Sequence, residues 1–87
     1  MFDSTMKFTT NMTRTEVEAL LVQCKAFADT ANLADVAKLI DFTPGTPALE
    51  MSKRVHEALA MLGGEDEYAL LIDRLDMLTV NIANLKD

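Results

Sequence analysis

The chain has 87 residues, of which 14 are acidic and 8 are basic, so its formal net charge is −6. Hydrophobic residues make up 49% of it, and it contains only three glycines and two prolines, a composition that excludes a disordered chain. The length leaves room for one domain with a modest core, and the negative charge disfavours binding to nucleic acid and to anionic membrane surfaces.

Cys24 is the only cysteine, so no internal disulfide can form. It lies on an apolar helical stripe, which indicates a buried structural thiol and not a nucleophile. The sequence shows no signal peptide, and no apolar run approaches the roughly 20 residues of a membrane span. We therefore expect a cytoplasmic protein.

Residues 1–12 lack helical periodicity. Met6, Phe8 and Met12 alternate with polar residues, which predicts an extended N-terminal arm or a short strand. This segment carries too many apolar side chains for a solvated tail, so we expect it to pack over the rest of the protein or to bind a partner. Residues 13–87 are expected to form a single helical-bundle domain.

Thr13 and Glu16 form a capping box, which predicts the start of the first helix. Apolar residues then recur at helical spacing as far as Ala31, with charged residues on the opposite face. A second, short helix follows and reaches about Asp41. The pattern is compatible with a break at Asn32 and also with one helix that continues through it.

Residues 43–47, Thr-Pro-Gly-Thr-Pro, are the clearest break in the pattern. The first of the two prolines disfavours helix at the residue before it, and Thr46 can cap a third helix with Pro47 at its first position. This helix is predicted to run to about Leu62, where Gly63 permits the left-handed conformation that ends it.

The last helix, predicted to run to about Lys86, has the most regular pattern. One apolar residue follows another at steps of three or four residues: Tyr68, Leu71, Leu75, Leu78, Ile82 and Leu85. A seam this regular must be buried, and the acidic residues 65–67 before it suit the positive end of a helix.

We predict an all-α fold, a small bundle of three long helices and one short helix. Neighbouring helices are expected to be antiparallel because the loops are short. The predicted core comprises Val17, Leu21, Cys24, Phe27, Val36, Ile40, Val55, Leu59, Leu71, Leu75, Leu78 and Ile82.

The last helix carries more apolar surface than one seam requires. Leu70, Met77 and Val80 lie off the seam, and Asp73 and Asp76 lie beside them. The helix is therefore either the central helix of a monomer or a surface for a second protein molecule. We predict that these five residues bind a protein partner and that the protein forms a homo-oligomer through them, with the acids setting orientation and encounter rate.

No catalytic, cofactor or metal motif is recognisable. His56 and Cys24 are each single and lie far apart, so a zinc site has no support, and residues 65–67 lack the ligand order of a calcium loop. The carboxylates have no visible partner that would shift their pKa, and little chain remains to wall a pocket. We expect a protein that is not an enzyme and that takes no cofactor, metal or small-molecule substrate.

The sequence favours a non-enzymatic protein-binding module, such as an adaptor, a chaperone or a stoichiometric inhibitor. One alternative is a small acidic inhibitor of phage type, in which Asp66, Asp73, Asp76 and Asp87 mimic phosphates and block a nucleic-acid-binding machine.

A second alternative comes from residues 44–47, Pro-Gly-Thr-Pro, which lie between two amphipathic helices in a chain of this length. Over about residues 33–62 this arrangement resembles the helix–loop–helix of type III secretion needle and rod subunits. The resemblance implies a structural subunit of a helical assembly.

Overall fold

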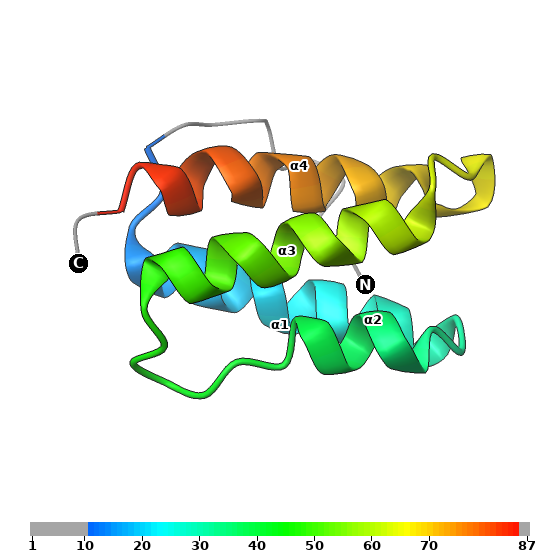
Figure 1. The fold of residues 1–87 in the computed structure, drawn as a ribbon, viewed down its shortest axis with the longest axis horizontal. Coiled ribbons are helices and arrows are strands. Elements are labelled where there is room, and N and C mark those ends of the chain that lie inside the picture. The colour runs from blue at the N-terminus through cyan, green and yellow to red at the C-terminus, as the bar shows by residue number, and fades with distance from the viewer. Residues whose placement is uncertain (1–10, 86–87) are drawn as a thin grey trace.

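The structure, a computed structural model, describes residues 11–85, so the predicted arm lies outside the described residues except for Asn11 and Met12. Its helices are α1 (Arg14–Thr30), α2 (Ala34–Leu39), α3 (Ala48–Leu62) and α4 (Ala69–Ala83), and a single 3-10 turn, η1 (Asp66–Tyr68), precedes α4 (Figure 1). No strand occurs within residues 11–85. The predicted all-α bundle of three long helices and one short helix is confirmed.

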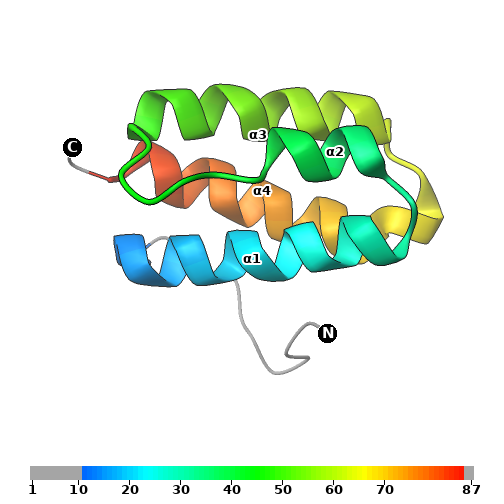
Figure 2. The same ribbon diagram turned by 90° about the horizontal axis from the view of Figure 1, so that it is seen from below.

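The bundle has α4 on one side and α2 on the other. α4 packs against both α1 and α3, and α2 also packs against both of them. The connection between α2 and α3, residues 40–47, runs beside the N-terminal half of α1 before α3 begins (Figure 2). In the described part of the chain, no helix is long and apolar enough to cross a membrane.

The first helix begins as predicted. The Glu16 amide donates to the Thr13 hydroxyl (3.2 Å), and the Thr13 amide donates to the Glu16 carboxylate (2.9 Å), which completes the capping box. At the other end, Asn32 adopts a left-handed conformation with φ of 61°. That conformation cannot continue a right-handed helix, so α1 and α2 are separate.

The start of α3 differs from the prediction. Pro47 lies just before the helix, and no side chain caps it. The Thr46 hydroxyl donates instead to the Thr43 carbonyl (2.7 Å) and stabilises the turn that precedes the helix. The predicted stop is confirmed, because Gly63 ends α3 with a φ of 65°.

The predicted seam lies in the core. Its four central residues, Leu71, Leu75, Leu78 and Ile82, are buried, and Tyr68 and Leu85 are half-buried at its ends. The predicted core residues are buried, except that Phe27 and Leu59 are only half-buried. Buried apolar residues outside the predicted set are Leu20, Ala28, Ala37, Met51, Ala58, Leu62 and Met77.

Candidate functional site

The predicted partner surface on α4 is only partly exposed. Leu70 and Val80 are 45% and 37% exposed, and Asp73 and Asp76 are exposed beside them. Met77, by contrast, is 0% exposed, so the prediction that it reaches solvent is wrong. The physical reason is that α4 packs against both α1 and α3, so the buried arc of α4 is wider than the arc that the seam residues occupy.

Two polar residues share the buried flank of α4 with Met77. The side-chain amide of Asn81 donates to the Met77 carbonyl (2.9 Å), and its oxygen accepts the Met12 N–H (2.9 Å). Asn81 therefore fastens the residues before α1 to α4. Arg74 is also buried, and it donates to the exposed Asp73 carboxylate (2.7 Å), which offsets part of the charge of the predicted acidic rim.

The apolar content of the exposed α4 face is small. Because Leu70 is 45% and Val80 37% exposed, covering what remains of both would contribute only about 2 kcal/mol. Association of two proteins costs about 4–15 kcal/mol in lost freedom of motion, so these two side chains are too few to hold a dimer by themselves. The predicted self-association through α4 stays a prediction, and it has lost Met77, its central residue.

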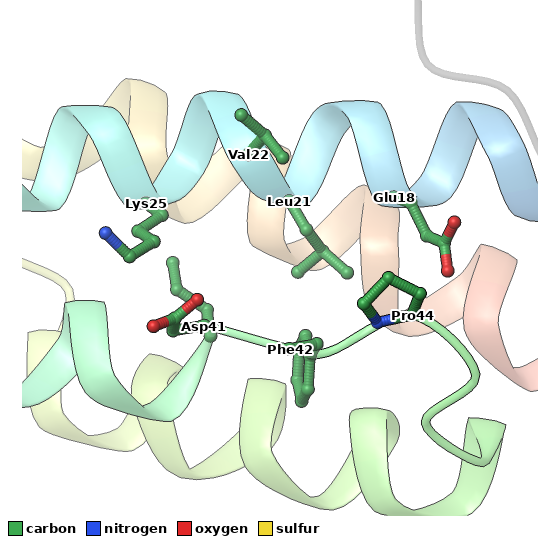
Figure 3. Close-up of a pocket in the computed structure, with 8 residues that line it drawn as sticks. Glu18, Leu21, Val22, Lys25, Asp41, Phe42 and Pro44 are labelled. Atoms are coloured by element: carbon green, nitrogen blue, oxygen red, sulfur yellow. The ribbon is translucent and has the colours of Figure 1, made fainter.

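A groove lies on another side of the molecule, between α1 and the connection from α2 to α3 (Figure 3). Its cavity measures about 240 Å³, and we call it the α1–loop groove. Leu21 points from α1 toward the connection, with Lys25 and Asp41 at one end and Glu18 and Pro44 at the other (Figure 3). The lining residues are Glu18, Leu21, Val22, Lys25, Ile40, Asp41, Phe42 and Pro44.

Two arginines hold the outer wall of this groove. The Arg54 guanidinium on α3 lies 4.5 Å from the centre of the Phe42 ring and donates to the carbonyls of Lys38 (2.9 Å) and Asp41 (3.4 Å). At the far end of the connection, Arg14 donates to the Thr46 carbonyl. The wall is thereby tied to α3 at one end and to α1 at the other.

The charged groups at the opening of the groove differ in their partners. Lys25 donates to Asp29 (2.9 Å), and this hydrogen bond, with the charges of Asp29 and Asp41, raises the pKa of Lys25. Glu18 pairs with Arg14 (3.4 Å). The Asp41 carboxylate has no hydrogen bond or ion pair in the part of the chain that the structure describes, so it remains open to a cation from outside.

Cys24 lies in the core and not in the groove. It is fully buried, and burial raises the pKa of its thiol to about 12, while the positive charge of Arg74 acts in the opposite direction. The thiol therefore stays protonated at neutral pH, which excludes it as a thiolate nucleophile there. Within residues 11–85 no group of three or more histidine, cysteine or acidic residues is placed to hold a metal ion.

The groove is not predicted by the sequence pattern. The sequence does carry one signal of it, because Val22 is an apolar residue that lies off the inner stripe of α1. In the structure this side chain is 69% exposed. Phe42 and Arg54 meet only because the connection folds back onto α3, and nothing in the local pattern indicates that contact.

Comparison with known proteins gave no match: no family model matches the chain, and no curated protein or solved structure is significantly similar to it.

Proposed function

We propose that this protein is a non-enzymatic protein-binding module, and that the α1–loop groove receives an apolar side chain of its partner. The observation that carries the proposal is the groove itself, an apolar recess with Val22 exposed at its edge and charged groups around it. An apolar centre with a polar rim is the usual anatomy of a protein interface.

The size of the groove supports a side chain as its occupant. Its volume of about 240 Å³ lies below the ~300–1,000 Å³ of typical small-molecule sites. It suits one or two amino-acid side chains better than a cofactor or a metabolite. Covering Val22, which is 69% exposed, would contribute about 1–2 kcal/mol, in addition to what the partner's own side chain gains.

The fixed wall supports a binding role as well. Since Arg54 and Arg14 already hold the connection against α3 and α1, little further ordering is needed when a partner arrives. A site that is formed in advance loses less conformational entropy on binding and so binds more tightly.

The exposed face of α4 is a second candidate contact for the same partner. Leu70 and Val80 supply a small apolar area there, and Asp73 and Asp76 add negative charge that favours a basic partner. The phosphate-mimic alternative depends on this face, and it predicts binding that weakens steeply between low and moderate salt.

Selection from a random peptide library tests the proposal. Peptides selected on the wild-type protein are measured against two variants, Val22→Glu in the groove and Met61→Glu, a matched exposed position on α3 that does not line it. We expect Val22→Glu to weaken binding at least about tenfold, because a carboxylate would have to be buried, and Met61→Glu to change it less than about twofold.

The same measurements distinguish docking at the α1–loop groove from docking on the exposed face of α4. If the selected peptides bind both variants as tightly as the wild type, the groove is not the docking site. Peptides that lose affinity on Val80→Glu alone would assign docking to α4 instead.

A further inference from the structure

We infer that the α1–loop groove of one molecule receives Leu49 from a second copy of this chain, with Lys53 of that copy placed against Asp41. The inference rests on the proposed function of the groove as a docking site, and it names the occupant.

Leu49 is the most exposed large apolar residue in the described part of the chain, at 84%. It stands in the first turn of α3, where the helix end leaves it open to solvent on the surface. Lys53 follows four residues later, so the two side chains are neighbours on one face of the helix, one turn apart. Lys53 is exposed too, and among the described residues it has no hydrogen bond or ion pair.

The groove presents the complementary pair at the same spacing. Leu21 on α1 points into the groove, and Val22 lies at its edge. Lys25, about one turn further along that helix, marks the end where Asp41 lies (Figure 3). Because Lys25 is bonded to Asp29, the Asp41 carboxylate is available for another cation. An apolar side chain followed by a basic one at the next turn therefore matches the groove in both chemistry and spacing.

The contact must join two molecules. Leu49 does not line the groove of its own chain, so the protruding side chain and the recess are separate surfaces of one molecule. A contact between unlike surfaces is heterologous, and it generates a ring or an open filament according to whether the rotation closes. This differs from a two-fold dimer, in which one surface meets its own copy.

Sedimentation analysis of the whole protein tests the inference. The concentration series extends to about 1 mM, because an interface built on one apolar side chain and one ion pair is weak. We expect the average mass of the wild type to rise with concentration. Val22→Glu places a carboxylate at the edge of the recess, and Leu49→Glu removes the protruding apolar side chain, so each variant alone should stay monomeric. An equimolar mixture of the two should form dimers and nothing larger, since one intact recess meets one intact Leu49. Circular dichroism confirms that each variant keeps its helices.

A charge exchange tests the polar half of the contact. Asp41→Lys and Lys53→Glu should each weaken association, and the double variant D41K/K53E should restore it, because the pair is then present with its signs reversed. A wild type that stays monomeric throughout the series overturns the inference, and so does association that Val80→Glu abolishes and Val22→Glu leaves intact. In either case the groove can still bind selected peptides, so the proposed function would stand or fall by its own experiment.

Discussion

Arg54 holds the outer wall of the groove, and replacing it with methionine should loosen that wall without unfolding the bundle. Methionine keeps an unbranched stem near Phe42 but loses the charge above the ring, 4.5 Å from its centre. It also loses the donors to the carbonyls of Lys38 (2.9 Å) and Asp41 (3.4 Å). These contacts join α3 to the end of α2 and to the connection, so the damage should be local.

The expected loss follows from those contacts. A cation over an aromatic ring contributes about 0.5–1 kcal/mol at an exposed site. The hydrogen bond to Asp41 is long at 3.4 Å, so the two hydrogen bonds together count as roughly one, worth about 0.5–1.5 kcal/mol. The free energy of unfolding should therefore fall by about 1–2.5 kcal/mol, which lowers the melting temperature by about 4–20 °C for a domain of this size.

Hydrogen exchange distinguishes a local from a global effect. The Thr46 amide donates to the Thr43 carbonyl (3.2 Å) within the connection, so its protection reports whether the wall is in place. We expect Arg54→Met to reduce that protection more than the protection of core amides such as Leu75. Arg54→Lys keeps the charge but not the planar group, so its Thr46 protection should lie between that of the wild type and that of Arg54→Met. Lys53→Met is the matched control and should change stability by less than about 0.5 kcal/mol.

The reasoning about Arg54 fails if Thr46 and Leu75 lose protection equally, since the residue would then stabilise the whole bundle and not the wall. It fails as well if Arg54→Met and Lys53→Met are indistinguishable in urea unfolding.

Three further predictions concern the core and the helix ends. Asn81→Ala should destabilise the protein by about 1–3 kcal/mol in urea unfolding, because the half-buried Met12 N–H loses its acceptor; a loss under about 0.5 kcal/mol would contradict this. Above pH 9.0, the ordinary pKa of the thiol, stability should decline because the unfolded Cys24 ionises while the buried one, with a pKa of about 12, stays protonated. Urea unfolding between about pH 8 and about pH 10.5 should show a shallower decline for Cys24→Ala, and equal slopes would refute the assignment. Gly63→Ala should cost about 1 kcal/mol in thermal unfolding, because φ is 65° there; an unchanged melting temperature would show that the turn relaxes.

Features that depend on neighbouring residues could be predicted from the sequence. The start of α1 follows from Thr13 and Glu16, which bond to each other across three residues, and the end of α3 follows from the conformational freedom of Gly63. The sequence does not decide whether the helix breaks at Asn32, because asparagine tolerates both helical and left-handed backbone. Local chemistry allows either outcome there, so packing decides.

The burial of Met77 depends on how many helices surround α4, and a single sequence does not contain that number. The periodic seam shows that one face of α4 is covered, yet α1 and α3 both pack against it. Asn81 and Arg74 are buried on the same widened flank, and polar residues there look like solvent-facing ones in the sequence pattern. Tertiary packing overrides the local pattern at these three positions.

The distribution of charge distinguishes the two modes of self-association. A two-fold contact through α4 would bring Asp73 and Asp76 near the same residues of the second copy, and like charges brought together raise the free energy of the complex. A head-to-tail contact through the groove instead sets Lys53 against Asp41 and covers Leu49, the most exposed large apolar side chain in residues 11–85. Since each chain carries a net charge of −6, unlike charges placed together at an interface between copies offset part of their mutual repulsion. The contact of Lys53 with Asp41 would supply such a pair, and a contact of Asp73 and Asp76 with their own copies would not.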